Sequence, residues 1–295
     1  MDVSSKNNEN LNADELPLTV YTPDSALGSP REMLRDMLKD LKKSRYLAWR
    51  LAVRDIRAQY RQAFLGIAWA FIMPLANTLT WIFLSGTGIV RVADTTVPYP
   101  VYVFTGTMLW AIFMDALNAP LQQTSNARSM LAKLNFPREA LIISGMYQTM
   151  FNAGIKILLV LCALPFLGVV PGWGILLFPF GLFSLVMVGT ALGLVFTPLG
   201  LLYSDIGKGL PLVLQFFMYL TPVVFPIPES GWASILIKLN PLSPLILTCR
   251  DWLTGMTPEY IVYFIAVNIL AFALLFVVWA AYRLAMPILI ERMSS

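Results

Sequence analysis

The chain has 295 residues, of which 57% are hydrophobic and 13% are charged, and its formal net charge is +4. A soluble domain has about one charged residue in four, so this composition excludes an ordinary soluble enzyme and indicates an integral membrane protein. The chain has no histidine, which excludes histidine catalysis, histidine metal sites and histidine proton relays. Its two cysteines, Cys162 and Cys249, lie far apart, and we expect both to be reduced.

The first 44 residues form a polar extension without the apolar core of a signal peptide. Residues 1–30 show little periodicity, so a mobile tail is expected there. In REMLRDMLKDLKK (31–43), apolar residues recur at helical spacing between charges, which predicts a short amphipathic helix. This helix either docks on a partner or is a solvated helix with no special role.

Residues 45–64 are predicted to form a helix that lies in the membrane interface. At about 100° per residue, an arc of arginines stands beside a stripe of aromatic and aliphatic residues, the layout of an interfacial helix. The arc consists of Arg50, Arg54, Arg57 and Arg61, and the stripe of Trp49, Val53, Ile56, Tyr60 and Phe64. Guanidinium groups bind phosphate through paired hydrogen bonds. The arginines therefore anchor the helix to lipid headgroups, bind a phosphorylated lipid substrate, or do both.

Six apolar runs follow, and together they predict an all-α fold with six transmembrane helices in residues 65–290. A membrane span needs about 20 apolar residues, and the fifth run is the weakest because it is short. The runs are 65–89, 99–118, 140–168, 173–203, 210–225 and 260–282. If every run crosses and the N-terminus is inside, 17 of the 21 lysines and arginines lie in inner segments. This asymmetry favours cytoplasmic locations for both termini.

Two connections differ from simple loops. Residues 119–139 form the longest inner connection, and a helix over about 126–135 would suit force transfer from a soluble partner, although the segment could equally be a passive loop. Residues 229–259 are partly apolar and interrupted by prolines. Non-helical backbone at membrane depth is tolerated only inside protein or beside water. We therefore expect re-entrant helices on the outer side, with an ordinary surface loop as the alternative.

Polar residues inside the predicted spans are costly in lipid and were therefore considered for function. Asp115 is expected to reach water at the inner end of the second span, whereas Lys156, in mid-span, is expected to face a partner or a cavity. Polar and aromatic residues of the spans either pack between helices or line a pathway, where rings could stack on sugars. The channel-lining candidates are Trp69, Asn77, Trp81, Trp110, Phe216, Phe217 and Tyr219.

The chain also lacks the phosphate-binding sequence GxxxxGK[ST], since the fragment IGKGL has neither the leading glycine spacing nor the Ser or Thr. We therefore do not expect this chain to hydrolyse ATP. Voltage-sensor arginine repeats and a potassium-filter sequence are absent from the sequence as well.

Several stretches in combination resemble one family, the permease subunit of type-two ATP-binding-cassette exporters for polysaccharides such as O-antigen, capsule and teichoic acid. The resemblance covers about residues 45–290 and excludes the N-terminal extension. The stretches are RDIRAQYRQAFLGIAWAFIMPL (54–75), YVFTGTMLWAIF (102–113), NARSMLAKLNFPREAL (126–141), SDIGKGLPLVLQFFMYLTPVVFP (204–226) and LNPLSPLI (239–246).

The resemblance implies a homodimer in the bacterial inner membrane that works with two copies of a cytoplasmic ATPase. ATP and magnesium would bind that ATPase, and neither a cofactor nor nucleic acid is expected on this chain. The substrate implied is a polysaccharide on undecaprenyl diphosphate, whose diphosphate the four arginines would bind. The first, second and fifth spans would line the channel, and residues 229–259 would form gate helices. The residues implied to couple to the ATPase are Asn126, Arg128, Met130, Leu131 and Lys133.

Two alternatives were weighed. One is an exporter of a drug or a lipid with the same fold, which would differ in what accumulates inside cells that lack it. The other is a membrane-embedded glycosyl- or acyltransferase. Such acyltransferases generally use histidine, which this chain lacks. The glycosyltransferases need carboxylates in an outer loop. Those available here are Asp94, Glu229, Asp251 and Glu259.

Overall fold

The computed structural model describes residues 30–61, 68–90, 93–133 and 137–294. Within these residues the chain is helical and has no strand. Contacts divide the chain into two compact units, Met1–Lys43 and Ser44–Ser295. The predicted mobile tail lies almost wholly outside the described residues, and so does Phe64 of the predicted aromatic stripe.

Helix α2 (Pro30–Arg61) runs without a break through both of the segments predicted to be helical near the N-terminus. Its first residue is proline, which suits the first turn of a helix because its missing N–H would have no helical partner there. After Pro30 the helix contains neither glycine nor proline, so nothing in the backbone interrupts it. The first unit contributes residues 30–43 of this helix, and the second unit begins at Ser44.

Four helices among the described residues are long and apolar enough to cross a membrane. They are α4 (Tyr99–Asn126), α6 (Glu139–Phe166), α7 (Phe178–Leu202) and the apolar part, Ile261–Met286, of α11 (Ile261–Ser294). Helices α3 (Trp69–Gly86) and α8 (Ser204–Tyr219), which correspond to the first and fifth predicted spans, are shorter. The second, third and sixth predicted spans therefore match long helices, and the fourth matches α7 preceded by a short 3-10 turn, η2 (Trp173–Leu176).

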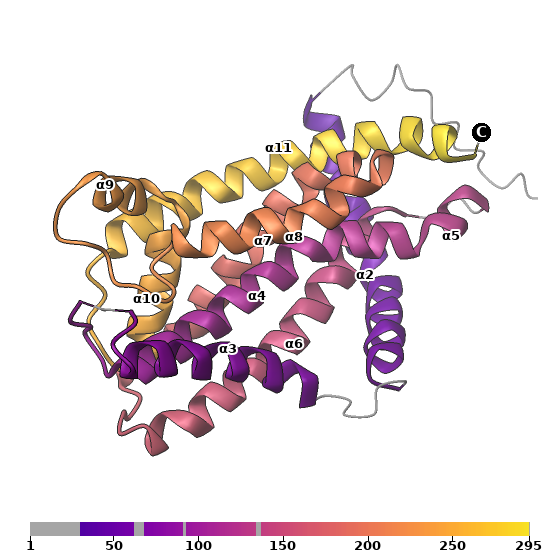
Figure 1. The fold of residues 1–295 in the computed structure, drawn as a ribbon. Coiled ribbons are helices and arrows are strands. Elements are labelled where there is room, and N and C mark those ends of the chain that lie inside the picture. The colour runs from indigo at the N-terminus through magenta and orange to yellow at the C-terminus, as the bar shows by residue number, and fades with distance from the viewer. Residues whose placement is uncertain (1–29, 62–67, 91–92, 134–136, 295) are drawn as a thin grey trace, which may run out of the picture. The chain divides into compact units, whose positions relative to one another are not determined.

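Helix α4 is the centre of the second unit, and every residue from Val101 to Trp110 is buried. It packs on α3, α6, α7 and α10 (Leu242–Thr254), as Figure 1 shows for the diagonal run of α4 beside α7. Two glycines of α7 allow the closest approach. A Cβ on Gly193 would lie 2.2 Å from the Leu117 carbonyl oxygen, and one on Gly189 would lie 2.6 Å from the Ala116 Cβ. Small residues at such crossings let membrane helices pack closely.

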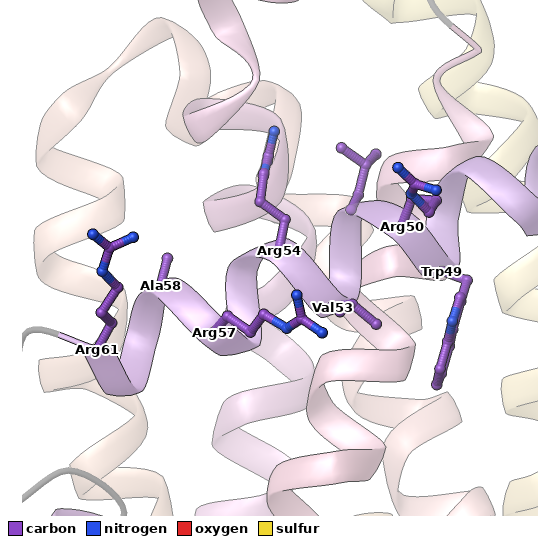
Figure 2. Close-up of a pocket in the computed structure, with 8 residues that line it drawn as sticks. Trp49, Arg50, Val53, Arg54, Arg57, Ala58 and Arg61 are labelled. Atoms are coloured by element: carbon purple, nitrogen blue, oxygen red, sulfur yellow. The ribbon is translucent and has the colours of Figure 1, made fainter.

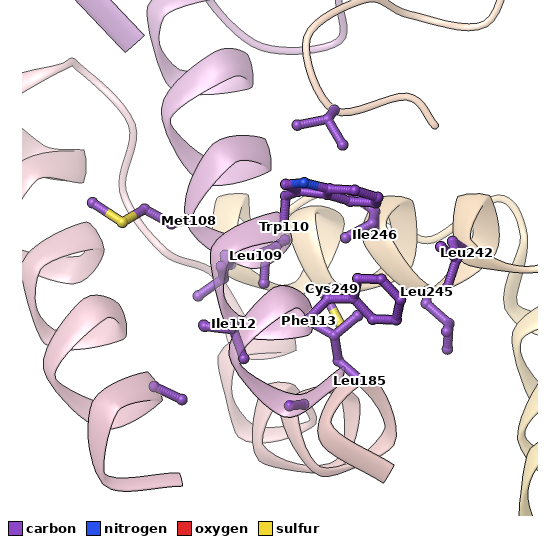
Figure 3. Packing of buried hydrophobic residues seen from close by; sticks show 14 of the residues in the cluster. Met108, Leu109, Trp110, Ile112, Phe113, Leu185, Leu242, Leu245, Ile246 and Cys249 are labelled. Carbon is purple, nitrogen blue, oxygen red and sulfur yellow. The ribbon is translucent and has the colours of Figure 1, made fainter. Parts of the chain in front are cut away.

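The buried apolar core extends from α4 to α10. Figure 3 shows Trp110 and Phe113 of α4 facing Leu245, Ile246 and Cys249 of α10, and all five belong to one buried cluster. Cys249 and Cys162 are free thiols, as expected.

Residues 204–209, which separate the fourth and fifth predicted spans, are helical, and their location on the inner side stays a prediction. Only Tyr203, with an extended backbone, separates α7 from α8, and the sequence SDIGKG forms the first turns of α8. The sequence is compatible with a helix start because Asp205 lies in the first turn, where a negative charge offsets the positive end of the helix dipole.

After the turn that ends α8, α9 (Trp232–Leu239) and α10 form a pair of helices that meet at 78°. The break lies at Asn240 and Pro241, because a residue before proline disfavours the helical conformation. The Asn240 side chain stabilises the corner. Its Nδ2 donates to the Leu220 carbonyl oxygen and to Thr221 Oγ1, each at 2.9 Å, and its Oδ1 accepts from the Leu242 N–H at 3.0 Å. Residues 229–259 thus contain helices, while their re-entry into the membrane from the outer side stays a prediction.

Candidate functional site

The four arginines of the predicted interfacial helix line one open pocket of about 970 Å³ along α2. We call Arg50, Arg54, Arg57 and Arg61 the arginine face. Figure 2 shows their side chains projecting from successive turns of the helix, with Trp49 at one end. The remaining lining residues are apolar, namely Leu51, Val53 and Ala58. A basic surface with an apolar floor can hold an anionic group that carries an apolar chain.

Most of the positive charge on the arginine face is not paired with an acidic side chain of the described residues. Arg54 Nε lies 2.7 Å from the Asp55 carboxylate, and Arg50 Nη1 donates to the Tyr46 hydroxyl at 3.3 Å. Arg57 and Arg61 make no ion pair within the part of the chain that the structure describes. Exposed ion pairs such as Arg54–Asp55 are weak, so they leave the arginine available to a stronger anion.

Residues beside and behind the arginine face attach the helix to α6. Tyr60 donates a hydrogen bond to Asn152 Oδ1 at 2.9 Å, and Gln148 Nε2 donates to Gln59 Oε1 at 3.1 Å. Gln148 in turn accepts from Gln123 of α4 at 2.7 Å. Burial raises the pKa of the Tyr60 phenol above its ordinary value, which keeps it a neutral donor. The arginine face is therefore held at a set orientation to the bundle.

Aromatic contacts reinforce this attachment. The Trp49 ring meets Tyr147 edge-on at 5.8 Å, and the Tyr60 ring lies 6.5 Å from Phe151. Sequence reasoning placed the aromatic stripe of α2 only in the membrane interface and missed these contacts with α6. The signal that was available is the spacing of Gln148, Asn152 and Lys156, which puts three polar residues on one face of an apolar helix.

The third member of that face forms an ion pair inside the bundle. Lys156 Nζ lies 2.5 Å from Asp115 Oδ2 and 3.5 Å from the Ala111 carbonyl oxygen. The Lys156 side chain is 7% exposed, whereas that of Asp115 is 37% exposed. Asp115 is partly exposed, in line with the expectation, and its carboxylate also neutralises a buried lysine. Lys156 does face a partner, but that partner is α4 of the same chain.

The predicted coupling helix, expected over about 126–135, corresponds within the described residues to α5 (Arg128–Lys133). Arg128 is exposed, Met130 is half-buried and Leu131 is buried, while residues 134–136 lie outside the described part. Asn126 is the last residue of α4, so α5 follows the central helix directly. Helix α5 also packs on α11.

Polar contacts also connect three long helices, α4, α6 and α11. Arg283 of α11 lies 3.0 Å from the Glu139 carboxylate of α6, which is buried. The Tyr282 and Thr124 hydroxyls, from α11 and α4, lie 3.1 Å apart. A displacement of α5 would therefore act on a connected group of helices rather than on a loose loop.

The channel-lining candidates divide into an exposed group and a buried one. Trp69, Asn77, Phe216 and Phe217 are exposed on α3 and α8. Trp81 bridges the two helices. Its ring lies 6.0 Å from Tyr219 and 5.2 Å from Phe225. Trp110, in contrast, is 6% exposed and packs on Phe113 in the core, so this structure gives it a packing role.

Comparison with known proteins shows which family this chain resembles. The family model described as "ABC-2 type transporter" matches residues 46–251. The O-antigen export system permease protein RfbA of Myxococcus xanthus is 26% identical over 214 residues, which cover 71% of this chain and 81% of the relative. The polysialic acid transport protein KpsM of Escherichia coli is 25% identical over 255 residues, which cover 79% of this chain and 91% of the relative.

Proposed function

Since the chain belongs to the ABC-2 type transporter family, we propose that it is the permease of an ATP-driven polysaccharide exporter. Its substrate is a polymer carried on undecaprenyl diphosphate, which it moves across the bacterial inner membrane. The observation that carries this proposal is the arginine face, an open basic surface attached to the bundle by residues beside and behind it. The relatives named for O-antigen export and polysialic acid transport support the choice of a polysaccharide.

The arginine face suits a lipid diphosphate because it combines charge with apolar surface. Guanidinium groups on successive turns can each bind phosphate oxygens through paired hydrogen bonds. The apolar residues Leu51, Val53 and Ala58 in the same pocket would lie against the first units of the polyprenyl chain. The sugar chain would then be guided by rings at the exposed surfaces of α3 and α8.

The proposed assembly is a homodimer of six-span subunits, in which α3 and α8 complete the set of crossing helices and both termini are cytoplasmic. The exposed apolar faces of α3 and α8 would meet the second copy across the channel. Helices α9 and α10 would dip in from the outer face beside its exit. ATP and magnesium act on two copies of a separate ATPase, which would contact α5.

The mechanism follows from the connections of α5. Closure of the ATPase pair on ATP would push α5, which is joined to α4 and packed on α11. Because α4 contacts α3, α6, α7 and α10, its displacement would reach both the arginine helix and the outer helices. Replacing Arg128 and Lys133 by Ala should therefore uncouple ATP hydrolysis from transport in the assembled transporter. Normal coupling in that variant would rule out this contact with the ATPase.

The substrate class is tested by what accumulates when the chain is removed. In a deletion strain we expect a lipid-linked polysaccharide to build up on the cytoplasmic side, and a plasmid copy of the chain should restore export. A strain that exports its polysaccharides normally, but retains a lipid or becomes sensitive to a drug, would instead identify an exporter of the same fold with a different substrate.

A further inference from the structure

Arg250 on α10 is a fully buried cation, with 1% of its surface exposed. Its Nη2 donates to the Val223 carbonyl oxygen at 2.9 Å, and its guanidinium carbon lies 3.6 Å from the centre of the Tyr102 ring. Its Nε and Nη1 have no hydrogen-bond partner in the described structure. Within the described residues Arg250 makes no salt bridge, although the adjacent Asp251 interacts with it electrostatically. A buried charge without a direct ion pair is expensive, and such residues in membrane proteins usually serve a function.

The contacts of Arg250 converge on the turn that follows α8. The Tyr102 hydroxyl donates to the Pro222 carbonyl oxygen at 3.1 Å and to that of Phe225 at 3.3 Å. Tyr102 of α4 and Arg250 of α10 therefore donate hydrogen bonds to three carbonyl groups of the same turn. We call Tyr102, Val223 and Arg250, with Gly106, the outer clamp.

Gly106 shows how closely the clamp is packed. A Cβ at this position would lie 2.2 Å from the Val223 carbonyl oxygen and 2.4 Å from Arg250 Nη2. Real Cβ atoms do not approach that near, so only glycine leaves room for the turn and the guanidinium group against α4. The clamp is thus built from three separate parts of the chain.

The clamp is joined to the proposed channel surface. Phe225, whose carbonyl Tyr102 holds, packs its ring against Trp81 of α3, and Trp81 also contacts Tyr219 of α8. The position of the turn therefore sets where these three rings lie. At its other end, α10 follows the corner at Asn240, which is itself bonded to Thr221 in the same turn.

We propose that Arg250 is a positioning residue for transport, which fixes α10 and the turn 221–225 on α4 and thereby places Phe225 and Trp81 at the outer end of the pathway. The guanidinium group is needed because it stacks on a ring and donates to a carbonyl at the same time, which an ammonium does poorly. This role rests on the proposed function, because the pathway that it serves is that of the exporter.

Cys249, the neighbour of Arg250, provides a natural reporter of this clamp. It is fully buried, and its Sγ lies against α7 at Gly181. In a Cys162→Ser background, the assembled transporter with its ATPase would be treated with N-ethylmaleimide. The native sequence should react slowly. Arg250→Gln should react about tenfold faster, because α10 loses the stacking and the hydrogen bond that hold it. Arg250→Lys should lie between the two.

Lys238→Gln is the matched control, because it removes one positive charge from exposed α9 without touching the clamp, and its labelling should equal that of the native sequence. Export should fall in Arg250→Gln at an unchanged amount of assembled transporter, and recover partly in Arg250→Lys. Faster labelling with normal export would overturn the positioning role, and unchanged labelling would overturn the clamp itself.

If Arg250→Gln does not assemble, Tyr102→Phe provides the second test. It keeps the ring under the guanidinium and removes only the two bonds to Pro222 and Phe225. Cys249 labelling at the native rate in Tyr102→Phe would count against the clamp. Labelling requires no transport, so it is independent of the substrate. A native chain that fails to restore polysaccharide export to the deletion strain would contradict the proposed function and leave the labelling result standing.

Discussion

The positive charges of this protein are used in two contrasting ways. The arginine face on α2 is open to its surroundings, with one weak ion pair among its four arginines. Lys156 and Arg250 are buried inside the bundle, where one is paired with Asp115 and the other is stacked on Tyr102. The arginine face therefore has hydrogen-bond donors available for a ligand. The charges of the two buried residues are instead used in contacts between helices.

This difference leads to opposite expectations for mutations. Removing a contact of a buried cation should cost stability, because a charge is left in a low-dielectric interior. Removing an exposed arginine should cost little stability, so a loss of transport there would report on the ligand. The predictions below test this separation, beginning with the buried pair.

Asp115→Leu should give the largest loss of stability. It leaves Lys156, which is 7% exposed, without its counter-ion, and breaking such a pair costs about 3–5 kcal/mol. The lower end is expected because the Asp115 side is partly open. The measurement is the thermal unfolding midpoint of the purified transporter. The Asp115→Leu/Lys156→Leu double variant should recover much of the loss, and a double variant as unstable as the single one would contradict the ion-pair explanation.

Tyr102→Leu should have the next largest effect. It removes both the ring beneath Arg250 and the hydroxyl that holds the turn, and a desolvated cation–π contact alone is worth about 2 kcal/mol. Tyr102→Phe should lose only about 1 kcal/mol, because it keeps the ring. The same unfolding assay measures both. Equal losses in the two variants would show that the hydroxyl, and not the contact with Arg250, stabilises this region.

The long helices could be predicted from the sequence because each is a sustained apolar run. The start of α8 could not, because SDIGKG has the composition of a loop, whereas in the structure only the extended residue Tyr203 separates α7 from α8. The arginine face also followed from helical spacing alone, because it depends on one continuous helix and on no distant contact.

The contacts between distant segments were the part that sequence could not supply. Asp115 and Lys156 are 41 residues apart, and Arg250 and Val223 are 27 apart. Asp115 and Lys156 were visible as costly charges, and Arg250 was not singled out. A single sequence carries no information on which helix faces which. The buried position of Trp110 could not be predicted for the same reason, since an aromatic residue on α4 suits a core as well as a channel.

On the exposed side, replacing Arg54, Arg57 and Arg61 together by Gln should lower export about tenfold, since each charge-assisted hydrogen bond to phosphate contributes more than a neutral one. The unfolding midpoint and the amount of inserted protein should stay unchanged. A matched control is Arg35, Lys39 and Lys42 to Gln, which removes three exposed positive charges from the first part of the same helix. Equal loss of export in both variants would assign the effect to general charge at the membrane surface.

The smallest effect should come from replacing the same three arginines by lysine. The net charge and the apolar floor of the pocket are kept, so binding to ordinary headgroups should be preserved. A diphosphate, however, is held best by planar groups that donate two parallel hydrogen bonds, which lysine cannot provide. We therefore expect export to fall about threefold while binding of the protein to anionic vesicles is unchanged. Export at the native level would mean that the arginine face acts as a simple basic surface and does not recognise the geometry of a diphosphate.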